Sequence, residues 1–598
     1  MKNQKVQKIA LSGLFLSLCL ILPFLTGQIP KIGNAFLPMH LPVMLCGFIC
    51  GFGYGFGVGL VAPILRGAIF GMPALYPTAV WMAVELATYG LITGALWAKR
   101  KSTPWVLLRL AVAMVGGRVS WGITKAILLG GGEFGIKLFF LEGFATALPG
   151  IGIQIVLVPL IMKALEGVLD TNMRNVYFPY GKEHIKHSFG KELIGVLESG
   201  INSYDPEKSG DELISEAMAN PINSPSLSQL ANGKKNVVII ASDHTRPVPS
   251  KLIIPKMLEE IRLGAPDAKI TILIATGCHR GTTNEELISK FGKEIVENEE
   301  IYIHDCDEGE MLVNIGTLPS GGECVINKIA YDADLLVSEG FIEPHFFAGF
   351  SGGRKSVLPG VCARQTVLAN HCSEFIANEN CRTGILENNP MHGDMLWAAK
   401  KARLAYIVNV VLNDKKEVIF ATAGDPESAH KNGTDFLRAH CGVMAREADV
   451  VITTNGGYPL DQNVYQAVKG MTAAEATVKR GGVIIMLAKS NDGIGGAHFY
   501  HQLCDEPDIN KTMDLFLSRG RGETVPDQWQ TQVLLRVLLH AKVIYISEMD
   551  DSSVEKMHLI PAHSIEEALA MAKKLLSKDE ITVTAIPDGV SVIVEKEA

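Results

Sequence analysis

The segment Asn236-Val237-Val238-Ile239-Ile240-Ala241, followed at once by Ser242-Asp243-His244-Thr245-Arg246-Pro247, decides the fold of the larger part of this chain. A short run of consecutive apolar residues, mostly β-branched, is typical of a strand buried on both faces, as in parallel sheets covered by helices. Four further segments have the same character: 270–275, 335–338, 450–453 and 483–487. Amphipathic stretches separate them, so we expect α/β layers built on Rossmann-like parallel sheets.

Polar residues follow these strands immediately. Thr276-Gly277-Cys278-His279-Arg280 comes after the second strand, and the third leads into Glu339-Gly340-Phe341-Ile342-Glu343-Pro344-His345. The fourth is followed by Asn455-Gly456-Gly457 and then by Gln466 and Lys469. Ligands of open α/β sheets bind at the carboxyl ends of the strands. The sequence therefore predicts a site at one edge of the sheets.

The loop after the third strand combines a histidine, a glycine-rich turn and a lysine. His345 precedes Lys355 by ten residues, with Gly352-Gly353 between them, and His371 follows shortly after. A glycine turn with a lysine suits a phosphate-bearing cofactor, and a histidine supplies an acid–base group. The same turn could also be an ordinary start of a helix, and the sequence leaves both interpretations open.

Taken one at a time, the other residues also have ordinary structural explanations. Segment 243–247 could be a helix start with a cap and a proline in the first turn. His279 could be a hydrogen-bonded core histidine, and His371 alone is a weak indication of a metal site. Residues 466 and 469 share a helical face by spacing alone, and Trp529 could simply pack. Their joint order along the chain carries the functional interpretation.

Length and composition bound the remaining possibilities. A chain of 598 residues is too long for one core, so we expect two to four domains. The net charge of -8 and the lack of a basic stripe exclude nucleic acid as the main partner. The eleven cysteines are scattered without paired CxxC motifs, which disfavours a zinc ribbon or disulfide framework and indicates a reducing compartment.

Apolar residues are concentrated between Ile9 and Leu165, where charges are sparse. This composition predicts membrane spans rather than a cleaved signal peptide, because no small-residue cleavage site follows and apolar segments continue. The candidate spans are 9–25, 41–50, 54–70, 78–97, 105–129 and 145–165. We therefore expect an all-α membrane domain of six helices in contact with the lipid bilayer, its second and third helices short or broken by glycines.

Basic residues predict the orientation of this domain. Lys2, Lys5 and Lys8 precede the first span, and Lys99-Arg100-Lys101 lies between the fourth and the fifth. An even number of spans puts both groups on the cytoplasmic side, in agreement with the positive-inside rule. We expect a multi-pass protein of the cell membrane whose N-terminus and C-terminal domain are both cytoplasmic.

Charged residues inside membrane spans are costly and are functional by default. We expect Arg66, Glu85 and Arg118 to line a polar ligand cavity in the membrane domain. Three other cations lie nearer to span ends, where long side chains extend toward the lipid–water interface: Arg109, Lys125 and Lys137.

These patterns divide the chain into a membrane domain at 1–166, a linker at 167–178 and two α/β lobes at 179–440 and 441–598. The site would lie between the lobes, at the carboxyl ends of their strands. Segments 581–586 and 590–594 flank Pro587-Asp588-Gly589, which predicts a hairpin whose strands could return to the first lobe.

The membrane domain resembles the substrate-binding S components of energy-coupling factor (ECF) transporters. The resemblance depends on the lysine-rich start, the segment Phe36-Leu37-Pro38-Met39-His40-Leu41-Pro42, the glycine-rich run after it and Met82–Gly90. It implies capture of a small water-soluble nutrient. It also implies partners, the transmembrane T and ATPase energising subunits, because this chain has no Walker motif.

The remainder, from about residue 172, resembles the nickel-dependent lactate racemase family, whose marker residues occur here in the same order and at matching spacings. The resemblance implies two catalytic histidines, His279 and His345, and nickel bound by His371. It implies that a nickel-pincer nucleotide, derived from nicotinate, is bound by Asp243, Thr245, Gly352, Gly353 and Lys355. It implies substrate binding by Arg246, Gln466, Lys469 and Trp529.

The resemblance implies a racemase or epimerase of a lactate-like 2-hydroxy acid that works by proton-coupled hydride transfer. The two histidines would serve as bases for the two enantiomers. Cofactor-synthesis proteins would be partners, and the membrane domain would import the substrate or the nicotinate precursor. The alternatives are a transporter subunit whose soluble part only binds a ligand, and a zinc hydrolase, which would lack an HExxH motif here.

Overall fold

The computed structural model describes residues 2–26, 29, 35–95, 103–129, 135–165 and 173–596. The chain divides into two compact units, Met1–Met173 and Arg174–Ala598, and each is described here by itself. Residues 167–172, half of the predicted linker, and the basic group Lys99-Arg100-Lys101 lie outside the described residues.

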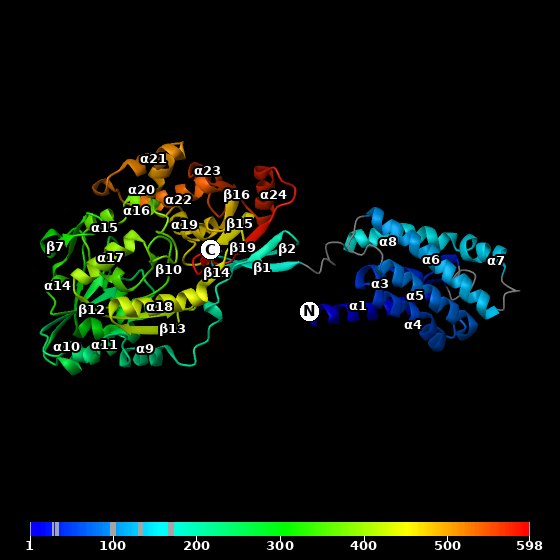
Figure 1. Ribbon diagram of the computed structural model, residues 1–598, viewed down its shortest axis with the longest axis horizontal. Coiled ribbons are helices and arrows are strands. Elements are labelled where there is room, and N and C mark those ends of the chain that lie inside the picture. The colour runs from blue at the N-terminus through cyan, green and yellow to red at the C-terminus, as the bar shows by residue number, and fades with distance from the viewer. Residues whose placement is uncertain are drawn as a thin grey trace. The chain divides into compact units, whose positions relative to one another are not determined.

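The first unit is helical (Figure 1). Its helices are α1 Lys2–Ile21, α3 His40–Cys50, α4 Phe52–Phe70, α5 Val80–Ala95, α6 Thr103–Leu129, α7 Ile136–Phe140 and α8 Leu148–Leu165. Helix α5 packs against α3, α4 and α6, so it occupies the middle of the unit. Among the described residues, three helical segments are long and apolar enough to cross a membrane: Lys8–Leu25, Phe52–Phe70 and Pro104–Leu129. The bent pair Ile136–Ala145 and Leu148–Ala164 makes a fourth if it counts as one span.

Glycines allow α4 and α5 to approach to backbone contact. A Cβ added at Gly90 would lie 2.1 Å from the carbonyl oxygen of Gly55, and one at Gly59 would lie 2.4 Å from the backbone of Leu86. Gly57, also on α4, has no atom within 4 Å of such a Cβ. Close backbone approach through small residues is the usual means of packing helices in a membrane, where the hydrophobic effect between helices is absent.

The contacts of the charged residues in the membrane unit overturn two expectations from the sequence. Arg118 donates to Glu85, while Arg66 has a different partner, the carbonyl oxygen of Leu20. Arg109 and Lys125 do not extend toward an interface. Arg109 is buried and donates to a backbone oxygen on α5, and Lys125 is paired with Glu142. Both were wrongly predicted because nearby helices supply acceptors that a span-by-span view of the sequence does not reveal.

The first sheet of the soluble unit has the order β13-β12-β9-β4-β5-β6. Its strands are β4 Asn236–Ser242, β5 Lys269–Ala275, β6 Glu300–Ile303, β9 Leu335–Phe341, β12 Leu404–Leu412 and β13 Val418–Gly424. All pairs are parallel except β12–β13, so only this edge is antiparallel. The chain runs outward from β4 to β6 and then returns to β9 on the other side of β4, which is the strand order of a Rossmann fold.

The unbroken apolar run in β4 is explained by helices on both faces. Val237 and Ile239 pack in a core with α11 (Ser250–Gly264), whereas Val238 and Ile240 pack in another core with α17 (Pro390–Lys401). Successive side chains of a strand point to opposite faces, so both faces must be apolar.

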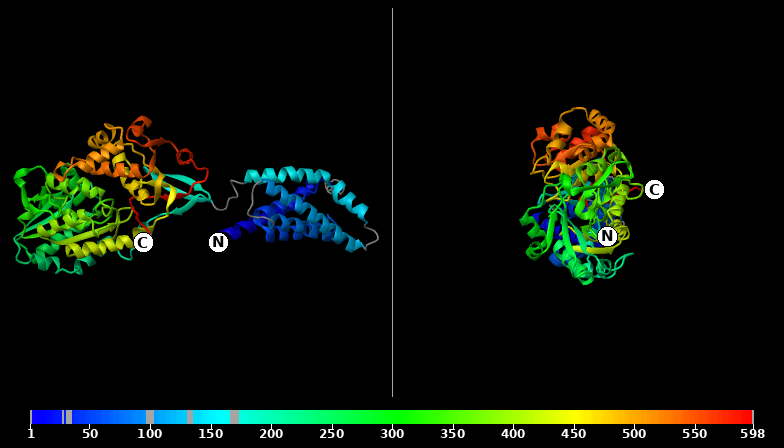
Figure 2. Two further views of the ribbon diagram at one scale, coloured as in Figure 1. Left: turned by 45° about the horizontal axis from the view of Figure 1, so that its top comes forward. Right: turned by 90° about the vertical axis from the view of Figure 1, so that its left-hand side faces the viewer.

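The second sheet is entirely parallel, with the order β18-β17-β16-β15-β19-β3. Its strands are β3 Leu193–Val196, β15 Ala448–Thr454, β16 Val478–Leu487, β17 Lys542–Ile546, β18 Ile560–Ala562 and β19 Val583–Ile586. Helices α19 (Val464–Glu475) and α22 (Gln528–His540) pack on one side, and α24 (Ile565–Leu576) packs on the other. Val451 of β15 belongs to the same core as Val238 of β4, so the two lobes share one apolar interior. Figure 2 shows the second lobe, orange to red, lying against the green first lobe.

Two expectations about the strands are corrected by the pairing. Strand β3 lies in the second sheet, although the sequence prediction placed its residues in the first lobe. The predicted hairpin after residue 581 is wrong, because β19 is held between β15 and β3 and has no free edge. The last strand, β20 (Ile593–Glu595), pairs instead with β14 (Gly442–Met444).

We predict that Gly90→Ala destabilises the membrane unit by about 1–3 kcal/mol, because the new methyl group meets the backbone of α4. Gly57→Ala is the matched control on α4, and its effect should stay within about 0.5 kcal/mol or be stabilising. Thermal unfolding of the full chain in detergent measures both. Equal midpoints for the two variants would contradict the close helix contact.

Candidate active site

One cavity, with a volume of about 520 Å³, lies at the carboxyl ends of the first sheet's strands and is completed by α19 and α22. It opens where the strand order reverses, between β4 and β9, which is the expected ligand position in this class of sheet. Eleven of the twelve residues predicted for the soluble site line it: Asp243, Arg246, His279, His345, Gly352, Gly353, Lys355, His371, Gln466, Lys469 and Trp529. Thr245, the twelfth, bonds Asp243 from beside the cavity.

Asp243 and His279 form a hydrogen-bonded pair at the ends of β4 and β5. His279 Nδ1 lies 2.7 Å from Oδ2 of Asp243, whose other oxygen accepts from the hydroxyl of Thr245, also at 2.7 Å. Burial by itself would raise the pKa of Asp243, but these hydrogen bonds outweigh it and hold the pKa below its usual range. The carboxylate is therefore ionised and accepts from Nδ1–H. Nε2 of His279 is left as the basic nitrogen.

His345 lies in a short ribbon formed by β10 (Pro344–His345) and β11 (Gly349–Phe350). Its ring stacks on Phe346, with centroids 5.1 Å apart, and its Nδ1 accepts a hydrogen bond of 3.3 Å from the amide of Ala348. Burial lowers the pKa of His345 well below its ordinary value, and the charges of Lys355 and Lys469 lower it further. The ring is therefore neutral at pH 7, with its proton on Nε2.

The glycine turn shapes the loop rather than offering a free amide. Gly352 and Gly353 have φ of 75° and 52°, and a Cβ on Gly353 would lie 2.8 Å from the ring of His430. The amide of Gly353 donates to Asn409 at 2.8 Å. Of the two interpretations that the sequence left open, the structure favours a tight turn, here before the short 3₁₀ helix η6 (Gly353–Ser356), over an amide cradle at this residue.

Arg354, within η6, was not singled out by the sequence. It is 2% exposed and donates to the carbonyl oxygens of Ala348 at 2.8 Å and Phe350 at 2.9 Å, and to Nδ1 of His392 at 2.9 Å. Burial lowers its pKa to about 9. The guanidinium thus ties the strand that follows His345 to the helix that carries Lys355.

Two lysines reach the cavity from opposite lobes. Burial lowers the pKa of Lys355 well below its ordinary value, and the neighbouring Arg354 and Arg246 add to this effect. Burial also lowers the pKa of Lys469, to about 8, while Glu343 opposes the shift. Glu343, another cavity residue that the sequence interpretation passed over, lies two residues before His345 in the chain and is the nearby counter-charge.

His371 is arranged as a single metal ligand. It is buried at the end of α15 (Arg364–Asn370), and its Nδ1 lies 2.9 Å from the carbonyl oxygen of Val367, which fixes the proton on Nδ1. Burial lowers its pKa to about 4, so the ring is neutral and Nε2 carries a lone pair. Phe347 and Trp529 pack edge-on against the ring.

The donor set fits a metal that is held mainly by a bound cofactor. Among the described residues, one group of three metal-binding side chains lies close together, Asp305, Cys306 and Asp307, and it does not line the cavity. Asp307 of that group is paired with Arg364. His371 therefore supplies one nitrogen, and its remaining partners would have to come from the cofactor itself.

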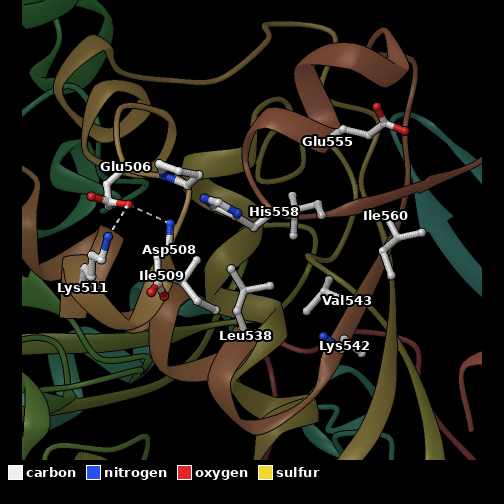
Figure 3. A pocket seen from close by; sticks show the side chains of 12 residues that line it. Glu506, Asp508, Ile509, Lys511, Leu538, Lys542, Val543, Glu555, His558 and Ile560 are labelled. Carbon is white, nitrogen blue, oxygen red and sulfur yellow. Dashed lines mark hydrogen bonds and ion pairs between the residues drawn. The ribbon is translucent and has the colours of Figure 1, made fainter. Parts of the chain in front are cut away.

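A second hollow of about 610 Å³ lies in the second lobe and contains none of the predicted residues (Figure 3). Several of its charged groups are already engaged. Glu506 accepts from the amide of Asp508 and lies 3.9 Å from Lys511, and His558 is bonded to the carbonyl oxygen of Leu503. It offers no acid–base pair comparable to that of Asp243 and His279.

Comparison with known proteins gives three matches along the chain. Residues 180–384 match the family described as "Lactate racemase N-terminal domain", and residues 443–594 match "Lactate racemase C-terminal domain". Residues 7–162 match "ECF transporter, substrate-specific component".

Individual relatives agree with the family matches. A lactate racemase of Thermoanaerobacterium thermosaccharolyticum is 52% identical over 427 residues, which is 71% of this chain and 100% of the relative. One from Lactiplantibacillus plantarum is 51% identical over 419 residues, 70% of this chain and 99% of the relative. The solved lactate racemase apoprotein from T. thermosaccharolyticum has a TM-score of 0.68 at 51% identity and covers 71% of this chain and 100% of its own.

We predict that Lys469 in the folded protein reacts with an amine-acylating reagent with a pH midpoint near 8. In the urea-unfolded chain the midpoint should move to about 10.4, the ordinary lysine value. The unfolded state then binds the proton more tightly, so stability should rise between pH 8 and 10 relative to Lys469→Met. Mass spectrometry of the labelled peptide and unfolding midpoints measure these effects. The same labelling midpoint in both states would contradict the buried position.

Proposed function

The chain belongs to the lactate racemase family, with an ECF transporter substrate-specific component at its N-terminus, and from this premise we propose what its site does. The chain is an isomerase. We propose that its cavity inverts a lactate-like 2-hydroxy acid by proton-coupled hydride transfer. The observation that carries this proposal is the convergence of two histidines, two lysines and an arginine from both lobes on one cavity.

His279 is the better prepared of the two proposed bases. Asp243 accepts its Nδ1–H, so Nε2 can take the proton of a substrate hydroxyl while the carboxylate stabilises the cation that results. His345 starts from the opposite tautomer, with Nε2–H available to hydrogen-bond the substrate oxygen. To act as the base for the other enantiomer it must move its proton to Nδ1, which gives up only the long bond from Ala348.

Arg246 and Lys469 are the proposed carboxylate ligands, with Gln466 orienting the acid. Trp529 would bound the substrate on the side of α22. A carboxylate between these cations would raise the pKa of Lys469 from about 8 toward its usual value and so keep the lysine charged. Glu343 is exposed, so the bound carboxylate would only partly replace it as the counter-charge of Lys469.

We propose a nickel-pincer nucleotide as the cofactor, bound through His371, Lys355 and the loop at Gly352 and Gly353, with Asp243 and Thr245 nearby. When bound, this group would supply the hydride acceptor and donor that the reaction needs. Lys355, whose buried amine has a lowered pKa, would hold the cofactor, and His371 would give Nε2 to nickel. Synthesis of such a cofactor calls for further proteins as partners.

For the membrane unit we propose six spans corresponding to α1, α3, α4, α5, α6 and α8, with the enzyme on the cytoplasmic side. Helix α3 has 11 residues and α5 has 16, so they would need neighbouring segments to complete a crossing. T and ATPase energising subunits are the proposed partners. Uptake of substrate or of a nicotinate precursor is the proposed role.

We predict that His279→Ala and His345→Ala each lower racemisation of lactate by at least about 100-fold, because each removes a general base. Both variants should retain nickel and cofactor absorbance. His501→Ala, an exposed histidine on α20 (Ala497–Cys504), is the control and should keep full activity. Chiral chromatography of cofactor-loaded protein measures the rates. Full activity in either variant would refute the two-base assignment, and lactate binding without racemisation by the parent chain would favour a purely binding role.

We predict that His371→Ala loses bound nickel, since its Nε2 is the proposed protein ligand. Metal analysis of purified protein measures the nickel content per chain, with His501→Ala again as the control. A His371→Ala protein with a full complement of nickel would remove this residue from the site.

A further inference from the structure

The membrane unit contains a buried cluster of three ionisable side chains that racemisation does not use: His40, Glu85 and Arg118. Their side chains are 3%, 3% and 5% exposed. His40 Nε2, at 3.2 Å, and Arg118 Nη1, at 2.7 Å, both bond the same oxygen, Oε1 of Glu85. The three residues come from α3, α5 and α6, so the cluster joins three helices.

Arg118 has hydrogen-bond donors that are not used in its pair with Glu85. Its Nε and Nη2 are buried and have no hydrogen-bond partner among the described residues. These two N–H groups lie on one edge of the guanidinium, the edge that grips a carboxylate through two parallel hydrogen bonds. Buried donors of a cation are costly to leave unmet, and more so in a membrane interior. The free edge therefore calls for an anionic ligand.

His40 adds a second requirement. An ionised carboxylate only accepts, so Nε2 of His40 donates to Glu85 and Nδ1 is the acceptor of the neutral ring. Nδ1 is also buried without a partner among the described residues. A hydroxyl group both donates and accepts, so it satisfies Nδ1 whether the ring is neutral or charged.

The other intramembrane arginines already have partners. Arg66 donates to Leu20, and its guanidinium lies over the ring of Phe24 at 4.9 Å. Arg109 donates to Thr93 and lies over the ring of Phe48 at 4.7 Å. Arg118 also lies over a ring, that of Trp121 at 6.0 Å, but it differs in being paired with an intramembrane carboxylate, Glu85.

We propose that His40, Glu85 and Arg118 form the ligand site of the membrane unit and that it takes a 2-hydroxy monocarboxylate. The carboxylate lies on the Nε/Nη2 edge of Arg118, and the adjacent hydroxyl meets Nδ1 of His40. Propionate leaves Nδ1 unmet, and nicotinate has no hydroxyl to offer. The identity of this ligand with the enzyme's substrate class rests on the function proposed above.

Equilibrium binding of radiolabelled L-lactate to the full chain in lipid nanodiscs tests the site. The parent chain should bind two lactates, one in each unit. Arg118→Gln should retain only the lactate of the soluble unit, with binding at the membrane site weakened at least 100-fold. Arg118→Lys keeps the charge without the two-pronged edge and should weaken it at least 10-fold. Two full-affinity sites in both variants would overturn the proposal.

Selectivity is tested in the Arg246→Gln chain, where the soluble site is weakened. Lactate should bind the membrane site about 10-fold more tightly than propionate, and nicotinate should not compete. His40→Gln keeps a donor for Glu85 but loses the Nδ1 acceptor, so it should bind lactate and propionate equally. Nicotinate binding as tight as lactate would overturn the ligand class.

Racemisation measured on the same nanodiscs separates this inference from the proposed function. If the parent chain does not racemise lactate but the Arg118→Gln variant still loses one lactate site, only the proposed function is contradicted. If the parent chain racemises lactate but Arg118→Gln leaves all lactate binding unchanged, only the inference about the membrane unit is contradicted.

Discussion

The buried guanidinium of Arg354 is the interaction on which the candidate active site depends. It is surrounded by backbone carbonyls and by ring nitrogens of His392 and His430, and none of these hydrogen bonds goes to a carboxylate. A buried cation persists only when its donors are met, so the loop must keep the shape that presents those oxygens. That shape fixes His345 at one end and Lys355 at the other. The positive φ of Gly352 and Gly353 is part of the same constraint.

Burial next to positive charge sets the chemistry of the whole cavity. Lys355, Lys469, His345 and His371 all have pKa values below their ordinary range because they are buried near one another. Asp243 alone keeps a low carboxyl pKa, because hydrogen bonds outweigh its burial. The result is one histidine, His279, that is hydrogen-bonded to an anion and two neutral histidines, His345 and His371, that are not.

The buried strands and most of the residues that line the cavity could be predicted from the sequence. Unbroken apolar runs identified the buried strands, and the polar residues after β4, β5 and β9 meet at one sheet edge because parallel strands end there together. The predictions that were wrong concern segments whose contacts are made with residues far away in the chain. The predicted hairpin does not form because β19 is paired with a strand on both sides. Arg109 and Lys125 are bound by acceptors on other helices. Local patterns carry no information on which edges and acceptors are already taken.

The sequence by itself determined which polar side chains follow the strand ends and so line one cavity, because strand burial and residue order are local properties. Only the tertiary structure decided which hydrogen-bond partner each side chain has and which of its nitrogens carries the proton. The tautomers of His279, His345 and His371 are set by Asp243, the Ala348 amide and the Val367 carbonyl, and the role of Arg354 by oxygens that fold around it. Hydrogen-bond partners and burial arise only once the chain is packed, and they decide where each proton resides.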